Sequence, residues 1–465
     1  MKVEIDRDIL KAVQIAEEET GSKCYLVGGF IRNRLLGYES EDIDFVIEGD
    51  SLLFAEKTAE ILGRKRIIKF PRFKTAKIVY KKKAIEFVSA RSEKYKSDSR
   101  KPDVRSASLF CDLSRRDFTI NALALSVRHT DTSDLIDFFN GKQDLVKKIL
   151  RTPLEPKITY SEDPLRMLRC IRFSSVLGFK IDPLSFSAIS ENKERIHIVS
   201  VERISDEFFK ILGSKNPVKG VYFLFRSGLL KEIFPELTDL CGIEEKDGIR
   251  HKDTFIHTLK VLFNISKVSN DIKLRLAALM HDIGKSKTKY FRPDQGWTFH
   301  GHDDKGSEMF FNIADRMKWS NDIREYVSKI ILLHHRPISL AKEEVTDSGV
   351  RRLLFEGGCL VDDLMLLCRA DITTANKNKL NKYLENFDNL SKKIVQVEEK
   401  DKLRNFKPPL GGDDIMKLFG IKEGPEIGRI KKQIVDAILS GEIDNDKDSA
   451  MEMLSKIIME EKVQK

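Results

Sequence analysis

The chain has 465 residues, of which 82 are Lys or Arg and 73 are Asp or Glu, so its formal net charge is +9. Charged residues make up 33% and hydrophobic residues 41%, a balance that excludes both a disordered chain and a membrane protein. Because a single hydrophobic core seldom grows past about 250 residues, this length predicts several domains.

The sequence carries no signal for export or for membrane anchoring. It has no run of about 18 apolar residues, and the N-terminal MKVEIDRDILKAVQIAEEET lacks the apolar core of a signal peptide. We therefore expect a cytoplasmic protein with no membrane partner. No CxxC spacing occurs, which argues against a disulfide framework and a zinc ribbon; the cysteines are Cys24, Cys111, Cys170, Cys241, Cys359 and Cys368.

The first 148 residues mix strand-like runs with helical stretches and predict an α/β or α+β module. Helices are expected at residues 7–19 and 51–62. Residues 64–83 hold ten Lys or Arg and no acid, and their apolar positions alternate loosely like those of strands. This segment is either a solvated hairpin or a surface for a phosphate backbone. Residues 149–465 have mostly helical apolar spacing and predict an essentially all-helical portion.

The sharpest local motif is a glycine pair followed by two aspartates. A strand that runs into Gly28-Gly29 and then a helix offers backbone N–H groups to a triphosphate, with Arg32 one turn into that helix. Asp42 and Asp44 stand two apart on a strand, so both point to the same face. Such carboxylates repel each other unless a cation lies between them, and Mg²⁺ is the expected occupant. Together the two halves outline a metal-dependent nucleotidyl transfer site.

Glu86 and the pair Arg115-Arg116 are further candidates, each with two interpretations. Glu86 lies inside an apolar strand, where an acid is costly without a partner. It is either a third carboxylate near the metal or an acid at a strand edge. The arginine pair precedes an acid and an apolar stretch that contains Asn121. It forms either a helix-starting ion pair or a clamp for phosphate and ribose.

A charged stripe is predicted along one helix shortly after residue 162. Asp163, Arg166 and Arg169 are spaced three apart, and Arg172 follows a further turn along. An Asp and an Arg that are held rigidly can hydrogen-bond the Watson–Crick edge of a base much as another base would. The stripe is therefore a candidate for nucleotide selection.

The order of these motifs resembles one known family. GGFIRNRLLG, DID, RRDFTINAL, EDPLRMLRCIRF and ERISDEFFKIL follow one another as in the class II tRNA nucleotidyltransferases, the CCA-adding enzymes and their poly(A) polymerase relatives. The resemblance covers essentially the whole chain. It implies an α+β fold, in which a small nucleotidyltransferase head with a mixed β-sheet precedes an all-helical neck, body and tail. The expected parts are the head at 1–148, the neck and body at 149–240, an HD domain at 241–390 and a tRNA-binding tail at 391–465.

The resemblance also implies the partners, which are tRNA, CTP and ATP and not DNA, and a role for each motif. It assigns Gly28, Gly29 and Arg32 to the triphosphate, Asp42 and Asp44 to Mg²⁺, and Arg115, Arg116, Asn121, Asp163, Arg166, Arg169 and Arg172 to the nucleotide and its selection. The 3′ hydroxyl of tRNA would then attack the α-phosphate and expel pyrophosphate. One departure is visible, because Asn33 stands where the family usually has an acid.

Histidines cluster in the helical portion, where seven of the nine fall within 85 residues: His251, His257, His281, His300, His302, His334 and His335. The order of His257, His281-Asp282, His334 and Asp371 matches the HD superfamily of metal-dependent phosphohydrolases, whose imidazoles and carboxylates suit a divalent metal. The identity of that metal stays open. Further ligands or phosphate contacts are expected from His300 or His302, and from His335 with Arg336. In the family, this domain resembles one with phosphatase and 2′,3′-cyclic phosphodiesterase activity.

The motifs leave CCA addition, A-only addition, CC-only addition and poly(A) synthesis open, because the nucleotide-selecting pair can serve all of them. We favour CCA addition. Residues 62–67 lack the Gly-Arg-Arg-Phe type signature of poly(A) polymerases, and a polar stretch at 94–113 could supply the mobile loop that A addition needs. The alternative from another class is a non-catalytic RNA-binding protein with an HD nucleotide hydrolase. It is disfavoured, since a pure binder has no need for clustered carboxylates beside an RNA.

Overall fold

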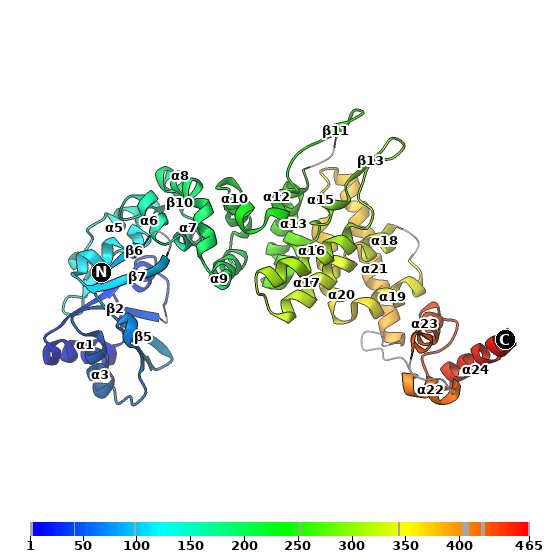
Figure 1. Ribbon diagram of the computed structural model, residues 1–465, viewed down its shortest axis with the longest axis horizontal. Helices are drawn as coiled ribbons and strands as arrows, with labels where there is room; N and C mark the ends of the chain where they lie inside the picture. Colours follow the sequence, from blue (N-terminus) through cyan, green and yellow to red (C-terminus); the bar gives the residue numbers. More distant parts are fainter. Residues whose placement is uncertain are drawn as a thin grey trace. The chain divides into compact units, whose positions relative to one another are not determined.

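The computed structural model describes residues 3–40, 42–96, 99–250, 253–342, 345–401, 409–419 and 424–463. His251 and part of the predicted tail therefore lie outside the described residues. The chain forms two compact units, Met1–Pro235 and Glu236–Lys465, and each is described by itself (Figure 1).

The first unit is built on a six-stranded mixed sheet with the order β3-β4-β5-β2-β1-β8. β2 and β5 run parallel, and every other neighbouring pair is antiparallel. The mixed sheet predicted for the head is confirmed. Its strands are β1 (Lys23–Val27), β2 (Asp42–Glu48), β3 (Ile68–Phe70), β4 (Thr75–Tyr80), β5 (Lys83–Ser89) and β8 (Ala124–Ser126).

Two helices lie together against this sheet, α1 (Arg7–Thr20) and α3 (Ser51–Ile61), and both match the sequence prediction (Figure 1). Each begins at an aspartate whose side chain accepts backbone N–H groups of the first turn. Phe54 of α3 contacts Phe87 of the sheet, which stacks on Phe45 with 5.3 Å between ring centroids. Because side chains alternate along a strand, these buried rings leave Asp44 and Glu86 on the opposite face.

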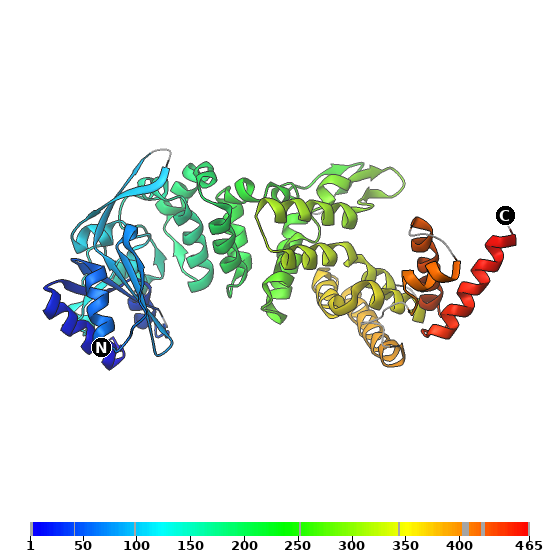
Figure 2. The same ribbon diagram turned by 60° about the horizontal axis from the view of Figure 1, so that its bottom comes forward.

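Two hairpins carry the basic and polar segments singled out in the sequence. β3 and β4 pair within residues 64–83, which forms the hairpin of the first interpretation and leaves the phosphate-backbone surface untested, and Lys69 forms an ion pair with Glu56 of α3. The polar stretch 94–113 contains the end of β6 (Arg91–Lys96), β7 (Ser99–Ser106) and most of α4 (Leu109–Ser114). β6 and β7 pair as a ribbon that projects from the sheet (Figure 2). Residues 97 and 98 lie outside the described residues.

The rest of the first unit is mainly helical. Its helices are α5 (Gly141–Lys147), α6 (Pro156–Glu162), α7 (Leu165–Leu177), α8 (Pro183–Asn192), α9 (Val201–Leu212), α10 (Pro217–Arg226) and α11 (Leu229–Ile233). α6, α8 and α10 each begin at a proline, whose fixed φ suits the first helical position. The expectation of helix throughout from residue 149 was too simple, because β9 (Ile149–Leu150) pairs in parallel with β10 (Lys180–Ile181).

The second unit packs helices around the histidine cluster. They are α12 (Pro235–Thr238), α13 (Thr254–Val268), α14 (Ile272–Met280), α15 (Lys285–Thr288), α16 (His302–Arg316), α17 (Asn321–Leu333), α18 (His335–Lys342), α19 (Asp347–Gly357), α20 (Val361–Asp371) and α21 (Lys377–Asp401). Two hairpins interrupt the predicted helical portion: β11 (Glu245–Lys246) with β12 (Ile249–Arg250), and β13 (Tyr290–Arg292) with β14 (Gly296–Thr298). They lie side by side (Figure 1), and the Trp297 indole N–H donates to the Ile249 carbonyl at 3.1 Å.

The end of the chain forms a small helical cluster. α22 (Gly412–Phe419), α23 (Pro425–Ser440) and α24 (Lys447–Val463) share a core that includes Ile415, Ile430 and Leu454. α21 runs without a break through residue 390, where the tail was predicted to begin, and packs on α18 and α19. Residues 402–408 and 420–423 lie outside the described residues. Among the helices described, none is long and apolar enough to cross a membrane.

Candidate active sites in the head cleft and the histidine cluster

Three carboxylates gather on the two parallel strands of the head sheet. The pairing of β2 with β5 sets Asp44 directly beside Glu86, and Asp42 lies two residues before Asp44 on the same face. Because β5 is flanked by β2 and β4, Glu86 is not at a sheet edge. Burial, together with the neighbouring charge of Glu86, raises the pKa of Asp44 to about 6. These carboxylates form no ion pair with any residue that the structure describes, so they offer oxygen ligands to a cation such as Mg²⁺.

Gly28 allows the chain to turn tightly above these carboxylates. Its φ is +69°, and a Cβ there would lie 2.8 Å from Nη1 of Arg116 and 3.9 Å from a carboxylate oxygen of Asp44. A side chain at this position would therefore enter the site. The Gly28 N–H donates to the Leu123 carbonyl at 3.3 Å. That amide was expected to be available to a phosphate, and it is already used.

Arg32 follows Gly28 and Gly29 on the short helix α2 (Gly29–Leu35) and is only 8% exposed. Its Nη1 donates to Asn121 Oδ1 at 2.6 Å, while its Nε and Nη2 both donate to Asn33 Oδ1, at 3.1 and 2.8 Å. Asn33, the departure from the family pattern, thus holds the guanidinium through a neutral amide oxygen. Burial and the nearby positive charge of Arg172 lower the pKa of Arg32 to about 10, which still leaves it charged at neutral pH.

Asp117 connects Arg32, through Asn121, to Arg169 of α7. Sequence reasoning did not select Asp117 as a site residue. One of its oxygens accepts from Asn121 Nδ2 at 2.9 Å, and the other accepts from Arg169 Nε and Nη2 at 2.8 and 2.6 Å. Although burial opposes its charge, Arg169 and Asn121 hold the pKa of Asp117 at about 2. The sequence feature that could have indicated a role for Asp117 is its position directly after Arg115 and Arg116.

Arg115 and Arg116 stand at the end of α4 rather than at the start of a helix. Both pair with Asp112, a buried acid of that helix, at 2.5 and 3.0 Å. The helix-starting ion pair considered from the sequence is therefore not formed, because their acid partner precedes them. Arg116 also donates to the Asn121 carbonyl at 3.4 Å. This pairing fixes the arginines at the rim of the carboxylate site.

The charged stripe extends along α7, but its first member precedes the helix. Asp163 directly follows α6, and its carboxylate accepts the N–H of Leu165 at 3.3 Å. Arg166 is buried and donates to a backbone carbonyl, whereas Arg172 pairs with Glu207 of α9 at 2.7 Å. Arg172 is thus neutralised by a protein acid, as Arg169 is, and Arg166 forms no ion pair with the acids that the structure describes.

One cavity of about 900 Å³ unites these groups, and all of the residues predicted for the head site line it. They are Gly28, Gly29, Arg32, Asp42, Asp44, Glu86, Arg115, Arg116, Asn121, Asp163, Arg166, Arg169 and Arg172. Sequence reasoning missed Arg91, Arg203 and Phe173, which also line it. The Phe173 ring has the guanidinium carbons of Arg32, Arg169 and Arg172 at 4.9, 5.6 and 4.1 Å from its centroid, so it spaces three like charges. No pattern in the sequence distinguishes this phenylalanine from a core residue.

The histidine cluster of the second unit brings the predicted HD residues together. His257 comes from α13, His281 and Asp282 follow α14, and Asp371 ends α20. His257 Nε2 lies 2.8 Å from Asp371 Oδ1 and 3.6 Å from Asp282 Oδ2. His281 Nε2 lies 3.5 and 3.4 Å from the same carboxylates. Lys285 Nζ donates to Asp282 Oδ2 at 2.7 Å.

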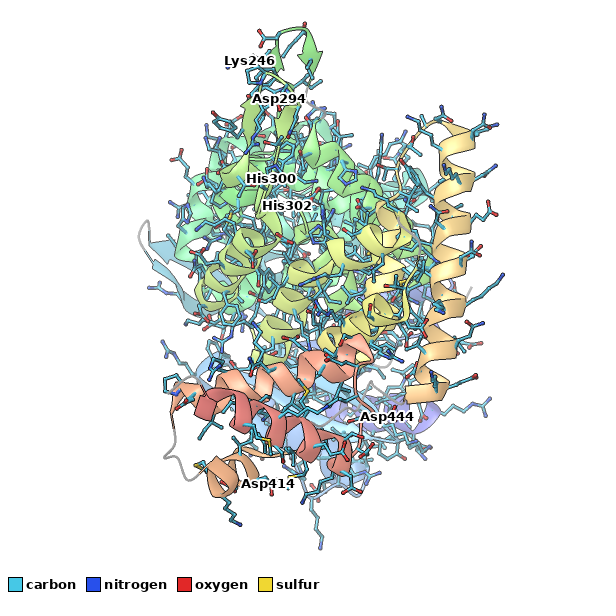
Figure 3. The ribbon with its side chains drawn as sticks, turned by 90° about the vertical axis from the view of Figure 1, so that its right-hand side faces the viewer. Lys246, Asp294, His300, His302, Asp414 and Asp444 are labelled. Atoms are coloured by element: carbon cyan, nitrogen blue, oxygen red, sulfur yellow. The ribbon has the colours of Figure 1, made fainter. Side chains whose placement is uncertain are left out.

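His334 lies with a second group of histidines rather than with His257 and Asp371. Its ligand atom and those of His302 and His335 all fall within 4.8 Å of one another. Of the two candidates at 300 and 302, His302 enters the cluster and His300 is exposed on the surface (Figure 3). Arg336, considered as a phosphate contact, instead pairs with Glu356 at 3.3 Å.

The charges of the cluster fit a metal site. Burial opposes a charge on His281, but Asp282 and Asp371 raise its pKa to about 10, and the histidines in turn hold the pKa of both acids well below the usual range. Among the described residues, four buried polar atoms of the cluster nevertheless have no hydrogen-bond partner: Nε2 of His281, His302 and His334, and Oδ1 of Asp282. Buried polar atoms are normally paired, so a cation is the group that this donor set lacks.

A cavity of about 200 Å³ opens beside the metal-ligand candidate Asp371. Its lining includes Thr373, Thr374, Tyr383 and Asn386, which give it a mixture of aromatic and hydrogen-bonding groups. A group bound to a metal at Asp371 would therefore have a partly polar pocket within reach.

Comparison with known proteins matches three segments to families. Residues 24–151 match the Poly A polymerase head domain, residues 178–241 the probable RNA and SrmB-binding site of polymerase A, and residues 254–376 the HD domain. The "Multifunctional CCA protein" of Legionella pneumophila (strain Lens) is 30% identical over 394 residues, which cover 81% of this chain and 90% of the relative. The "A-adding tRNA nucleotidyltransferase" of Deinococcus radiodurans is 30% identical over 343 residues, covering 71% of this chain and 76% of the relative.

Solved structures agree on the fold. The Thermotoga maritima CCA-adding enzyme complexed with tRNA superimposes with a TM-score of 0.60 at 22% identity, covering 97% of this chain and 96% of that one. The Bacillus stearothermophilus CCA-adding enzyme in complex with CTP gives a TM-score of 0.62 at 22% identity, covering 99% and 100%.

The head cleft and the histidine cluster define a nucleotidyltransferase joined to an HD domain, two families that depend on divalent metals. The relatives narrow this class further. The chain belongs to the tRNA nucleotidyltransferase family, the one that its motifs resemble.

Proposed function

We propose that this chain adds and repairs the 3′-terminal CCA of tRNA, with CTP and ATP as substrates and Mg²⁺ as the metal of the head. The observation that carries the proposal is the head cleft, in which three carboxylates and a row of arginines line one cavity. The carboxylates provide a place for cations, and the arginines provide donors for a triphosphate. The printed names of the relatives include both CCA and A-adding enzymes, so the experiment must count the nucleotides added.

In this proposal the residues of the chain bind and orient the reactants. Asp42 and Asp44 hold Mg²⁺ with Glu86 beside them, and the bound metal neutralises charge on the triphosphate and on the attacking 3′ oxygen. Arg32 is fixed by Asn33 and Asn121, so its guanidinium meets the triphosphate in one orientation. Little reorganisation is then needed when charge develops on the phosphate.

Selection of the nucleotide is assigned to Asp163 and Arg166. Arg169 and Arg172 are each paired with a protein acid, which leaves Arg166 as the arginine of the stripe available to a base. The backbone around Asp163 and Arg166 is fixed by the start of α7, where the Arg166 N–H donates to the Asp163 carbonyl at 3.0 Å. A rigid donor and acceptor on one edge can read the Watson–Crick edge of cytosine or adenine.

The test uses the full chain with Mg²⁺ and three tRNA transcripts that end before CCA, after the first C and after the second C. We expect addition of C, C and then A with arrest at that point, read at single-nucleotide resolution. Asp42→Ala should abolish addition, whereas Glu39→Ala, an exposed acid three residues earlier, should not. Growth only on the CC-ended transcript would make this an A-adding enzyme, arrest at CC a CC-adding one, and long A tails a poly(A) polymerase.

We further propose that the HD domain hydrolyses phosphate monoesters and 2′,3′-cyclic phosphates at RNA ends. The observation that favours this second function is the set of buried, unpartnered imidazole and carboxylate atoms around Asp282. When bound, a divalent metal there would activate water for attack on phosphorus. Incubation of the metal-loaded chain with an RNA that ends in a cyclic phosphate should yield an opened phosphate and then a free hydroxyl. His281→Ala should show neither product.

A further inference from the structure

The cavity beside Asp371 lies among three helices of the second unit, α18, α20 and α21, which contact one another (Figure 1). Asp371 itself lines this cavity. So does Thr373, whose Oγ1 lies 3.0 Å from Nδ1 of His257. The cavity therefore opens directly beside the histidine cluster. Attack of water on phosphorus needs only the groups of that cluster, which leaves the cavity without a role.

The floor of the cavity is apolar and fixed. Ala341, Cys368 and Phe387 line it, are at most 6% exposed, and belong to one hydrophobic core cluster of this unit. The Cys368 thiol donates to the His334 carbonyl at 3.0 Å, so its sulfur is already engaged. Such a floor is formed before any ligand arrives, and the apolar face of a ligand that covers it is removed from water.

Helix α21 adds two polar side chains to the wall of the cavity. Tyr383 and Asn386 stand three residues apart, so they lie on the same side of the helix. Both line the cavity and are partly buried, and neither forms a hydrogen bond with any residue that the structure describes. The amide offers a donor and an acceptor side by side, and the phenol ring offers a face for stacking. These are the groups with which proteins bind single nucleobases.

The size and the position of the cavity suit one base. Its volume of about 200 Å³ is below the roughly 300 to 1,000 Å³ of sites for drug-sized ligands, so it excludes a run of several nucleotides. In a nucleoside 2′,3′-cyclic phosphate, the phosphate and the base are carried by the same ribose. A phosphate held at Asp371 therefore places the base one sugar ring away, on the side where the cavity opens.

We propose that this cavity binds the base of the nucleotide whose phosphate is held at the histidine cluster, with Tyr383 stacking on the base and Asn386 hydrogen-bonding its edge. The inference rests on the phosphohydrolase proposed above and narrows its substrates from phosphate esters in general to nucleoside phosphates. An asparagine amide pairs with adenine through one donor and one acceptor, and adenine is the last base of CCA. The same chemistry is present at an RNA end and in a free nucleotide.

The first experiment compares two cyclic phosphates on the metal-loaded full chain. Adenosine 2′,3′-cyclic phosphate carries a base, whereas glycerol 1,2-cyclic phosphate has the same five-membered phosphate ring without one. We expect kcat/KM to be about 100-fold higher for the adenosine compound. Asn386→Ala and Tyr383→Ala should each reduce this preference about 10-fold, through KM rather than kcat. Asn389→Ala, an exposed asparagine of the same helix that does not line the cavity, should keep the native preference.

The second experiment measures binding without turnover. In equilibrium dialysis, the Kd of adenosine 2′-monophosphate should rise about 10-fold in Asn386→Ala and stay unchanged in Asn389→Ala. The head cleft is the same in both variants, so a difference between them reports the cavity. Equal kcat/KM for the two cyclic phosphates, or a Kd that Asn386→Ala does not alter, would overturn base binding. If the native chain hydrolyses neither compound, the proposed phosphohydrolase fails, and the dialysis still decides the cavity.

A third substrate separates the two sources of the nucleotide. It is a short RNA that ends in adenosine 2′,3′-cyclic phosphate. A loss of the same size on this RNA and on the free nucleotide in Asn386→Ala would support base binding at RNA ends. A loss on the free nucleotide alone would support base binding and assign the cavity to free nucleotides.

Discussion

The head cleft and the histidine cluster both gather charged groups, but they arrange the two signs differently. In the cleft, the unpaired acids lie on β2 and β5 and most of the arginines lie on other elements, around a cavity of about 900 Å³. In the cluster, the buried acid Asp282 lies within 3.9 Å of four histidines. Charges kept apart around a large cavity leave room for a triphosphate and an RNA end. Charges that are interleaved and buried leave room for ions.

The largest expected effect comes from disabling one site and measuring both activities. Asp42→Ala removes a proposed metal ligand of the head and should lower nucleotide addition about 1,000-fold, because metal-assisted charge neutralisation dominates this chemistry. Hydrolysis of the cyclic phosphate should change less than twofold. His281→Ala should give the reverse pattern. Loss of both activities in either variant would contradict the assignment of separate chemistry to the two sites.

Asp117→Asn tests whether the cleft is held in place by its buried network. The substitution leaves the size unchanged but removes the buried charge of Asp117 that pairs with Arg169, so the partly exposed guanidinium loses its acid. We expect kcat/KM for both nucleotides to fall about 10- to 100-fold, which corresponds to about 1.4 to 2.7 kcal/mol. Since the network joins Arg32 to α7, selectivity between CTP and ATP should fall as well.

The matched control for Asp117→Asn is Asp137→Asn. Among the residues that the structure describes, that aspartate accepts only from backbone N–H groups, at Phe139, Gly141 and Lys142, and it does not line the cavity. A loss of stability without loss of selectivity is expected there. Equal effects of the two variants on nucleotide choice would show that Asp117 acts through folding alone.

The motif residues of the head could be predicted because their chemistry is local. Two aspartates on one strand face follow from the period of a strand. A glycine pair between a strand and a helix, with an arginine one turn later, indicates a phosphate site from the residue types alone. Phe173 and Arg91 could not be predicted, since an aromatic residue on a helix and an arginine beside a strand are ordinary features without a three-dimensional partner. The same holds for the division of the histidines, because spacing along the chain does not tell which side of Asp282 each imidazole faces.

The short strands outside the head sheet were missed for a related reason. β9 and β10 are two residues each, and their pairing joins segments about 30 positions apart in the sequence. A two-residue strand has no periodicity to detect, so only tertiary context creates it. The helices, by contrast, carry apolar stripes and terminal prolines that are visible locally.

Asp44→Asn tests whether the negative charge of Asp44 lowers the stability of the metal-free chain. In the metal-free chain the pKa of Asp44 is about 6, above the ordinary 3.8, so the folded state binds this proton more tightly than the unfolded state. Stability therefore falls as pH rises from about 4 to 6, and the full cost of about 3 kcal/mol applies above that range. In EDTA, Asn at this position should raise the unfolding midpoint at pH 8 and raise it much less at pH 5.

Adding Mg²⁺ provides the control for that measurement. A cation that binds the carboxylates stabilises the native chain by mass action, and the variant gains less because it lacks a ligand. The advantage of the variant at pH 8 should then shrink or reverse. An advantage that is the same at both pH values would show that charge on Asp44 does not destabilise the metal-free head.

The smallest expected effect concerns Asn33, where the two regions differ in how they hold a cation. In the histidine cluster, the carboxylates that face cationic side chains carry a full negative charge. Arg32 is instead held by the neutral amide oxygens of Asn33 and Asn121. Asn33→Asp would pair the guanidinium with a charge and add a negative charge near the proposed triphosphate position. We expect KM for CTP and ATP to rise about two- to threefold at low salt with kcat unchanged, and the effect to weaken with ionic strength. A fall in kcat that salt does not alter would instead indicate a change in the position of Arg32.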